Sequence, residues 1–323
     1  MENLNRFKSV EEYIDSHDLP LNVKRQLKEN LRKLSTQKMN IMVTGATGCG
    51  KSSTINALFD TEKAVVGTSP NPQTMDIQRY EFDNLIIWDT PGLGDGVKED
   101  ERHTTNIINK LHEKDRNGDL LIDLVLVILD GSSRDLGTSL VLITDVLIPN
   151  LGEKPENRIL VAINQADMAM KGRYWDAEKN LPEQPLVDFL EEKVKSVRNR
   201  VWDSTKVDVD PVYYCAGYKE EGKPQEPPYN LNKLLYYIVS KAPEDKRVII
   251  FKTENQESVK RDTQLETERD YRKEREETVK KSMWSSVAKG ATVVAAIGGS
   301  IGGPVGAVIG GAIGGFLGGI FKW

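Results

Sequence analysis

The chain has 323 residues, of which 38% are hydrophobic and 29% charged, and its formal net charge is −5. This size allows one large globular domain with appended segments, and the acidic balance offers no basic surface typical of a nucleic-acid-binding protein. The first eleven residues lack the apolar core of a signal peptide, and two cysteines exclude a disulfide framework, so we expect a protein of the reducing cytoplasm.

Residues 1–38 predict an N-terminal helical segment with two helices separated by Pro20. Ser9 and Glu12 have the spacing of a capping box for the first helix. The second helix, residues 22–34, carries an apolar stripe formed by Val23, Leu27, Leu31 and Leu34. This stripe either packs on the domain that follows or binds a partner.

Residues 45–52 read G-A-T-G-C-G-K-S, between an apolar run that predicts a strand and a segment that predicts a helix. A glycine loop in that setting forms a phosphate site, because its amides and the helix N-terminus attract anions. We expect Lys51 to reach the β- and γ-phosphates and act in catalysis, and Ser52 to bind Mg²⁺. The nucleotide contacts predicted here are Gly45, Ala46, Thr47, Gly48, Cys49, Gly50, Lys51, Ser52 and Ser53.

Residues 85–92, L-I-I-W-D-T-P-G, predict a strand and a turn. Asp89 at the strand end is suited to hold Mg²⁺ through water. The backbone N–H of Gly92 is suited to contact a γ-phosphate, which makes Gly92 part of the predicted catalytic set. Loss of that phosphate would release the following loop, as in a nucleotide switch. The alternative is an ordinary strand and turn, since Pro-Gly is turn chemistry.

Residues 158–167 predict another strand, ending in N-Q-A-D, which supplies the predicted base contacts Asn164, Gln165 and Asp167. The carboxylate of Asp167 can accept from both N1–H and N2–H₂ of guanine. Adenine presents an acceptor at N1, so a site built around this pair of bonds rejects it. The alternative is a strand that happens to end in polar residues.

Residues 211–217 predict a further strand, ending in C-A-G. We expect Cys215 and Ala216 to contact the nucleotide, with the backbone N–H of Ala216 reaching guanine O6. A plain core strand fits this short segment equally well. Cys49, near a helix N-terminus, either has a lowered pKa or is a small residue that fits the loop; we favour the second interpretation.

These four motifs resemble an Era-like GTPase of the translation-factor-related class, over residues 38–242. The loop style, followed by I-N-A-L-F, is most similar to bacterial prophage-encoded or ribosome-binding GTPases and also resembles septin and chloroplast-import GTPases. The resemblance implies that the chain binds GTP or GDP with Mg²⁺ and hydrolyses GTP. The family pattern P-x-T-x-x-I matches residues 72–77 and identifies Thr74 as a Mg²⁺ ligand and catalytic residue, with Thr68 as the alternative.

Three positions depart from the family pattern. Gln165 replaces the usual Lys, so we expect specificity to be kept and affinity to fall. Gly48 stands where some relatives carry a K⁺-binding Asn. Leu93 follows D-T-P-G, where fast GTPases carry a Gln that orients water, so hydrolysis should be slow and activated by dimerisation or a partner.

His103 is either catalytic or, as we favour, a solvated residue near a helix start.

The fold predicted is an α/β P-loop G domain over residues 39–243, doubly wound around a mostly parallel six-stranded sheet. Strands are expected near residues 39–44, 77–82, 85–89, 122–129, 158–163 and 211–215. Helices are expected near residues 51–58, 101–114, 137–148, 184–202 and 229–240. Residues 170–184 and 217–228 are expected to be surface loops.

Residues 244–282 predict a charged helical linker. From 253 to 282 there is no Gly or Pro and the charges are mixed, which favours one solvated helix about 45 Å long, stabilised by ion pairs. This helix is either a spacer, a stalk or a weak dimer contact.

Residues 283–323 form a hydrophobic tail, uncharged from 291 to 321. Its glycines recur every four residues: Gly298, Gly302, Gly306, Gly310, Gly314 and Gly318. This glycine-zipper pattern is typical of helices that pack in membranes, and the stretch exceeds the roughly 20 residues of one span. We therefore expect membrane association of a cytoplasmic protein; a soluble glycine-rich tail is the alternative.

The sequence thus favours a GTP-dependent switch at a membrane, self-associating through the G domain and the tail. The alternative is a GTP-gated effector whose tail assembles in the bilayer and perturbs it. A ribosome-associated GTPase is the third interpretation, although no basic surface supports it. We expect no specific nucleic-acid partner.

Overall fold

The computed structural model describes residues 11–68, 76–94, 96–218, 225–265, 269–289 and 307–311. The chain divides into two compact units. The sheet unit comprises Met39–Ala242 and Thr253–Arg275, and the helical unit comprises Met1–Lys38, Pro243–Lys252 and Glu276–Trp323.

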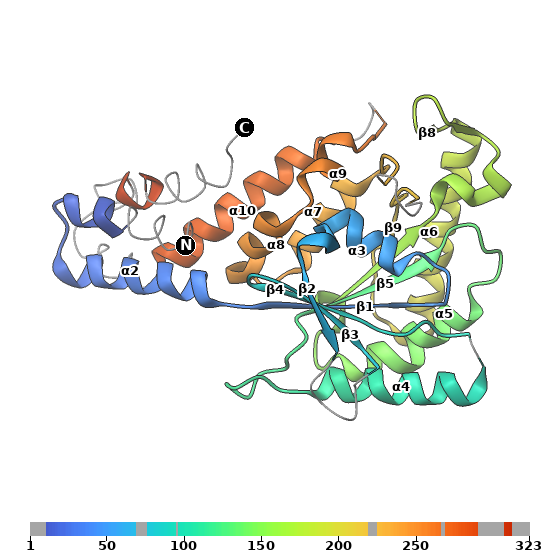
Figure 1. Ribbon diagram of the computed structural model, residues 1–323, viewed down its shortest axis with the longest axis horizontal. Helices are drawn as coiled ribbons and strands as arrows, with labels where there is room; N and C mark the ends of the chain where they lie inside the picture. Colours follow the sequence, from blue (N-terminus) through green and yellow to red (C-terminus); the bar gives the residue numbers. More distant parts are fainter. Residues whose placement is uncertain are drawn as a thin grey trace. The chain divides into compact units, whose positions relative to one another are not determined.

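The sheet unit is built on one seven-stranded sheet, in the order β2-β3-β4-β1-β5-β6-β9 (Figure 1). Its strands are β1 (Met39–Gly45), β2 (Val65–Thr68), β3 (Gln78–Phe82), β4 (Leu85–Asp89), β5 (Leu124–Asp130), β6 (Ile159–Asn164) and β9 (Val212–Tyr213). The five strands from β4 to β9 are parallel, while β2 and β3 pair antiparallel at one edge. The mostly parallel sheet is confirmed, but the count of six strands is wrong. The missed strand is β2, whose exposed Val65 and Val66 give no alternating pattern.

Helices cover both faces of this sheet (Figure 1). On one face lie α4 (Val97–His112), α5 (Gly137–Val141) and α6 (Gln184–Thr205); on the other lie α3 (Lys51–Phe59) and α7 (Leu231–Lys241). Alternate strand residues point to opposite faces, so Met42 and Val127 join a core with Ile107 of α4 and Leu190 of α6. Strands buried on both faces explain the almost wholly apolar run of β5. The predicted doubly wound arrangement is thereby confirmed.

Shorter elements complete the sheet unit. The helix expected at 137–148 continues from α5 through a π-helical turn, Leu142–Leu147, and a 3-10 turn, Ile148–Asn150. The loop expected at 170–184 contains a two-stranded ribbon, β7 (Trp175–Asp176) with β8 (Leu181–Pro182). Further 3-10 turns lie at Thr61–Lys63, Pro155–Asn157 and Ala166–Gly172.

The single solvated helix expected at 253–282 is wrong. The chain forms a 3-10 turn (Glu244–Lys246) and then three helices, α8 (Arg247–Thr253), α9 (Gln256–Arg261) and α10 (Tyr271–Ala288). Asn255 starts α9 by accepting from the backbone N–H groups of Glu257 and Ser258, and Asp262 leaves it in an extended conformation. Several side chains of this stretch are buried, including those of Val259, Tyr271, Arg275 and Val279.

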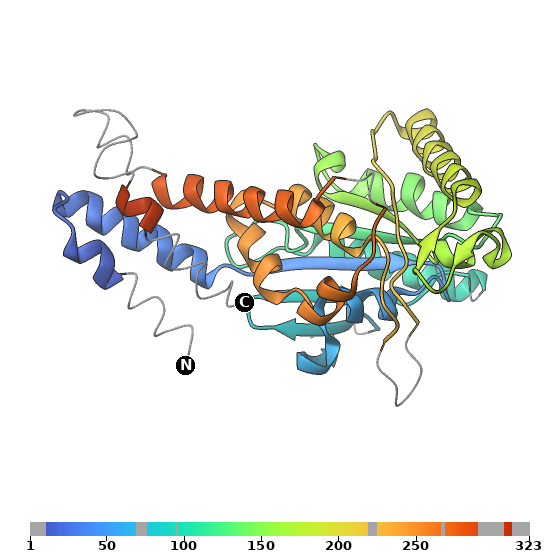
Figure 2. The same ribbon diagram turned by 90° about the horizontal axis from the view of Figure 1, so that it is seen from above.

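In the helical unit, residues 11–16 are helical and α2 spans Leu21–Thr36. The predicted apolar stripe of α2 is buried as expected. Helix α2 lies beside the C-terminal part of α10 (Figure 2). The side chain of Asn30 on α2 donates to the backbone oxygens of Val287 and Lys289, at the end of α10. Ser9, the proposed cap of the first helix, lies outside the described residues.

Of the hydrophobic tail, residues 283–289 and 307–311 are described; the first stretch belongs to the end of α10, and residues 307–311 are helical, with Val308 and Ile309 buried. The other residues of the predicted glycine zipper lie outside the described part of the chain. Among the described residues, no helix combines the length and hydropathy needed to cross a bilayer.

Candidate nucleotide-binding site

The loop between β1 and α3 has a backbone that requires glycine. Gly45 and Gly50 have φ angles of +149° and +88°. A Cβ on Gly45 would overlap the backbone oxygen of Ile128 on β5, and one on Gly50 would overlap the side-chain amide of Asn164. No side chain caps α3 at Gly50, so its first-turn N–H groups are left for an anion.

Lys51, the first residue of α3, folds back over this loop. Its Nζ donates to the backbone oxygens of Gly45 and Ala46, over 3.3 and 3.2 Å. Carbonyl oxygens are modest acceptors for an ammonium group, and phosphate oxygens are stronger ones. The geometry therefore suits the expected exchange of these contacts for β- and γ-phosphates.

Asp89 ends β4, whose residues pair in register with β1, so that Asp89 lies opposite Val43. Its Oδ1 is buried and has no hydrogen-bond partner among the described residues. Burial raises the pKa of Asp89 to about 6, although the charge of Lys51 lowers it. A buried carboxylate oxygen without a donor is costly, and a hydrated Mg²⁺ would satisfy it. The buried carboxylate of Asp89 therefore fits the Mg²⁺ ion expected with the nucleotide.

The D-T-P-G turn is tied to the phosphate loop by its backbone. Leu93 donates its N–H to Gly45 O over 3.3 Å, and its own oxygen accepts from Thr47 N over 2.9 Å. A Cβ on Gly92 would overlap Thr47, so glycine is required at this close approach. The side chain of Leu93 is buried in the core.

His103 lies on α4 with only 7% of its surface exposed, so the expected solvated histidine is wrong. It belongs to the covered side of the helix, which begins at Val97 and not near residue 101.

The end of β6 binds the phosphate loop directly. The side-chain amide of Asn164 donates to Cys49 O, and its Oδ1 accepts from Ala216 N, both over 3.1 Å. Gln165 Nε2 donates to Gly48 O over 2.9 Å. The predicted phosphate and base contacts, three segments far apart in sequence, thus meet at one place.

Asp167 and Cys215 also meet. Asp167 is half-buried in the turn after β6. Burial raises the pKa of the Cys215 thiol well above its usual value, and the charge of the Asp167 carboxylate acts on this thiol and helps to raise its pKa. Burial also raises the pKa of Cys49 to about 11, so the lowered pKa considered for that thiol is wrong.

Two site residues carried no signal in the sequence. Gln225, in the stretch expected to be a plain surface loop, donates from Nε2 to the backbone oxygens of Ala216 and Ser53. Tyr214 is fully buried, and its hydroxyl lies 2.6 Å from that of Thr54. Gln225 lies outside the motifs, and Tyr214 lies in the predicted strand at 211–217 but has no predicted role there; only the folded chain brings these partners together.

The threonine expected to bind Mg²⁺, Thr74, lies outside the described residues. The alternative, Thr68, ends β2. The choice between them stays a prediction.

Comparison with known proteins gives a family for this region. Residues 40–165 match the family described as 50S ribosome-binding GTPase. The chain carries a P-loop GTPase domain. The assignment of this domain to the Era-like subclass stays a prediction.

Curated relatives match parts of the chain. Heliobacterium modesticaldum tRNA modification GTPase MnmE is 29% identical over 161 residues, which cover 47% of this chain and 31% of that protein. Translocase of chloroplast 108 from Physcomitrium patens is 36% identical over 101 residues, covering 30% and 10%. Escherichia coli YfjP, an uncharacterized protein, is 28% identical over 155 residues, covering 47% and 50%. The chain thus spans half or less of these relatives.

Solved structures give a weaker likeness. Toc33 from Arabidopsis thaliana, in complex with Mg²⁺ and GMPPNP, superposes with a TM-score of 0.40 and 16% identity, over 65% of this chain and 83% of Toc33. The bacterial dynamin GTPase LeoA has a TM-score of 0.40 and 14% identity, over 91% and 46%. Scores this low support no statement about function.

Proposed function

We propose that this protein is a GTP-dependent switch with slow intrinsic hydrolysis. The proposal is carried by the direct contact between the phosphate loop and the predicted base-contact residues. The side chains of Asn164 and Gln165 donate hydrogen bonds to the backbone oxygens of Cys49 and Gly48. Asp167 would accept from guanine N1–H and N2–H₂, while Lys51 would hold the β- and γ-phosphates.

Mg²⁺ is the metal expected with the nucleotide. Ser52 would bind it directly, Asp89 through water, and Thr74 from the segment before β3. When bound, it would neutralise charge on the β- and γ-phosphates. The backbone N–H of Gly92 would add a contact that disappears when the γ-phosphate leaves, which supplies the switch.

Hydrolysis should be slow because the residue at position 93 is leucine, whose apolar side chain cannot orient the attacking water. Leu93 is enclosed in the core and its backbone bonds to the phosphate loop. The missing group would come from a second copy of the domain or from another partner. If self-association supplies it, the rate per molecule should rise with protein concentration. A rate per molecule that stays constant over a hundredfold range of protein concentration would exclude dimerisation, and another partner would then have to supply the missing group.

The tail supports a place of action at a membrane. Its long uncharged sequence and four-residue glycine repeat suit helices packed in lipid. Fractionation of the full chain and of a chain ending at residue 282, in GDP and in a GTP analogue, tests this. The full chain should bind vesicles and the shortened one should not; equal partition of the two would remove the membrane from the proposal.

The same preparations separate the alternative functions. Dye release from vesicles only with GTP would favour the membrane-perturbing effector. Co-sedimentation with ribosomes in one nucleotide state would favour the ribosome-associated GTPase.

A further inference from the structure

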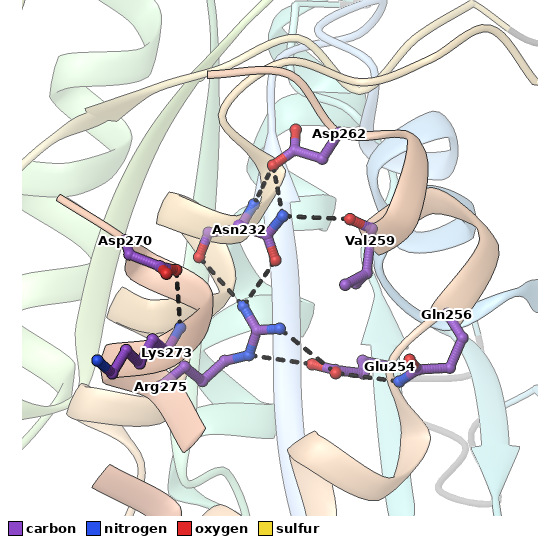
Figure 3. Close-up of polar contacts among 8 residues, drawn as sticks. All are labelled: Asn232, Glu254, Gln256, Val259, Asp262, Asp270, Lys273 and Arg275. Carbon is purple, nitrogen blue, oxygen red and sulfur yellow. Dashed lines mark hydrogen bonds and ion pairs between the residues drawn. The ribbon is translucent and has the colours of Figure 1, made fainter. Parts of the chain in front are cut away.

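A network of buried polar side chains lies on the segment Thr253–Arg275, which we call the return segment (Figure 3). Arg275, near the start of α10, has no exposed surface, and its Nε lies 3.1 Å from Oε2 of Glu254. Its Nη1 donates to the backbone oxygen and to Oδ1 of Asn232 on α7, over 3.3 and 3.0 Å. A buried ion pair is costly unless its geometry is well matched, so this network fixes where the return segment docks.

The same segment caps helix α7. The carboxylate of Asp262 accepts from the backbone N–H groups of Leu231 and Asn232, each over 2.8 Å (Figure 3 draws the contacts with Asn232). It also accepts from the side-chain amide of Asn232 over 2.8 Å. A carboxylate at a helix N-terminus satisfies first-turn donors and interacts favourably with the helix dipole. The return segment is thus joined to the GTPase domain by charge and hydrogen bonds.

Backbone pairing continues from Asp262 to the base-contact motif. Thr263 donates its N–H to Pro228 O over 3.1 Å, and Asn230 donates its N–H to Thr263 O over 2.9 Å. Tyr229, between them, exchanges two backbone hydrogen bonds with Cys215, over 3.0 and 2.9 Å. Cys215 precedes Ala216, whose backbone N–H donates to Oδ1 of Asn164 over 3.1 Å. Hydrogen bonds therefore connect the return segment to the base-contact turn at Cys215 and Ala216.

Gln225 makes a second connection. Its backbone oxygen accepts from Arg261 of the return segment over 3.0 Å. Its side chain donates to Ala216 O over 2.6 Å and to Ser53 O over 3.2 Å, and accepts from Asn56 over 2.5 Å. One side chain therefore sets the spacing between the base-contact turn and the phosphate-binding helix α3.

We propose that Gln225 is a positioning residue for guanine recognition, and that the return segment holds Gln225 and the base-contact turn in place. This inference rests on the guanine site proposed above. Because linkage is reciprocal, a guanine nucleotide should also stabilise the docked return segment. Leu93 and the loop's own glycines hold the amides of the phosphate loop, so we expect pyrophosphate binding to depend on Gln225 much less than guanine-nucleotide binding does.

Displacement of a fluorescent GDP by unlabelled GDP and by pyrophosphate, with Mg²⁺ present, tests the proposal. The variants are Gln225→Ala, Glu254→Gln and Arg261→Ala, the last removing an exposed contact without disturbing the buried network. Matched controls are Gln184→Ala, an exposed glutamine of α6, and Asp208→Asn, the carboxylate of an exposed ion pair with Arg198.

We expect Gln225→Ala and Glu254→Gln to weaken GDP binding at least about tenfold, Arg261→Ala about threefold, and none to change pyrophosphate binding more than about twofold. The controls should leave both ligands unaffected. A variant that only destabilises the fold weakens both ligands alike, so equal losses would overturn the positioning role.

Asp167→Asn separates this inference from the proposed function. If that variant keeps full GDP affinity, the guanine site itself is misassigned. If it loses affinity while Gln225→Ala, Glu254→Gln and Arg261→Ala keep it, only the positioning role is overturned. Should Glu254→Gln fail to fold, the comparison of Gln225→Ala with Arg261→Ala decides the question.

Discussion

Substitution of Gly50 by alanine tests how the guanine-reading strand depends on the phosphate loop. Gly50 has a φ of +88°, and an added Cβ would overlap the side-chain amide of Asn164. Gly118 is a matched control, because its φ is also +88° and nothing lies within 4 Å of its added Cβ. It lies in the exposed turn between Asp115 and Asp119, which has no part in the site. The two variants share the backbone strain and differ in the clash.

The expected magnitudes follow from these contacts. An alanine forced into the left-handed region costs about 1–2 kcal/mol, so Gly118→Ala should lower the free energy of unfolding by that amount. Gly50→Ala carries the same strain and also displaces Asn164 from Cys49, a hydrogen bond worth about 1 kcal/mol and more when the amide is left buried. We expect a loss of about 2–4 kcal/mol of stability in Gly50→Ala.

Nucleotide binding should separate the variants more sharply. Gly118→Ala should bind GDP as the wild type does, whereas Gly50→Ala should lose at least about tenfold in affinity. Urea unfolding gives the stabilities and displacement of fluorescent GDP gives the affinities. Equal stability losses together with equal GDP affinities would refute the idea that Asn164 must sit against Gly50 for the site to form.

Three further predictions test other parts of the site. Asp167→Asn should weaken GDP binding by about a hundredfold or more and improve binding of the xanthine nucleotide, whose base carries an acceptor where guanine has its amino group. An unchanged preference for GDP over the xanthine nucleotide would remove Asp167 from the base site. Chelation of Mg²⁺ should weaken GTP binding in the wild type and have much less effect in Asp89→Ala, as calorimetry can show; an equal effect in both would exclude Asp89 as a metal contact. Burial raises the pKa of Cys49 from 9.0 to about 11, so the fraction of this thiol that is ionised at pH 8 falls about a hundredfold. A thiol reagent should therefore modify Cys49 only above about pH 10 or after unfolding. Fast modification at pH 8 would contradict the burial of this thiol.

The sequence predicts those parts of the structure that are set by local rules. The glycine loop between an apolar run and a helix start, and the polar residues that end β4 and β6, were placed correctly because each lies within a few residues of the element that positions it. The parallel core followed from apolar runs such as that of β5.

What the sequence could not predict depends on contacts between distant segments. Gln225 gains its role from Ser53, 172 residues earlier, and no local pattern marks it. The predicted solvated helix at 253–282 includes Arg275, whose burial the sequence does not indicate because its partner Glu254 is 21 residues away, beyond the spacing of helical ion pairs. The absence of Gly and Pro from residues 253–282 favours one long helix. In the structure, Asn255 caps the start of α9 and Asp262, which binds the first turn of α7, ends it, so the stretch forms separate helices.

The most direct test of the account is calorimetric titration of the purified full chain with GTP and, separately, ATP in the presence of Mg²⁺. Asp167 should make GTP bind at least about a hundredfold more tightly than ATP. Equal affinities for the two nucleotides, or binding of neither, would contradict a guanine-specific P-loop switch.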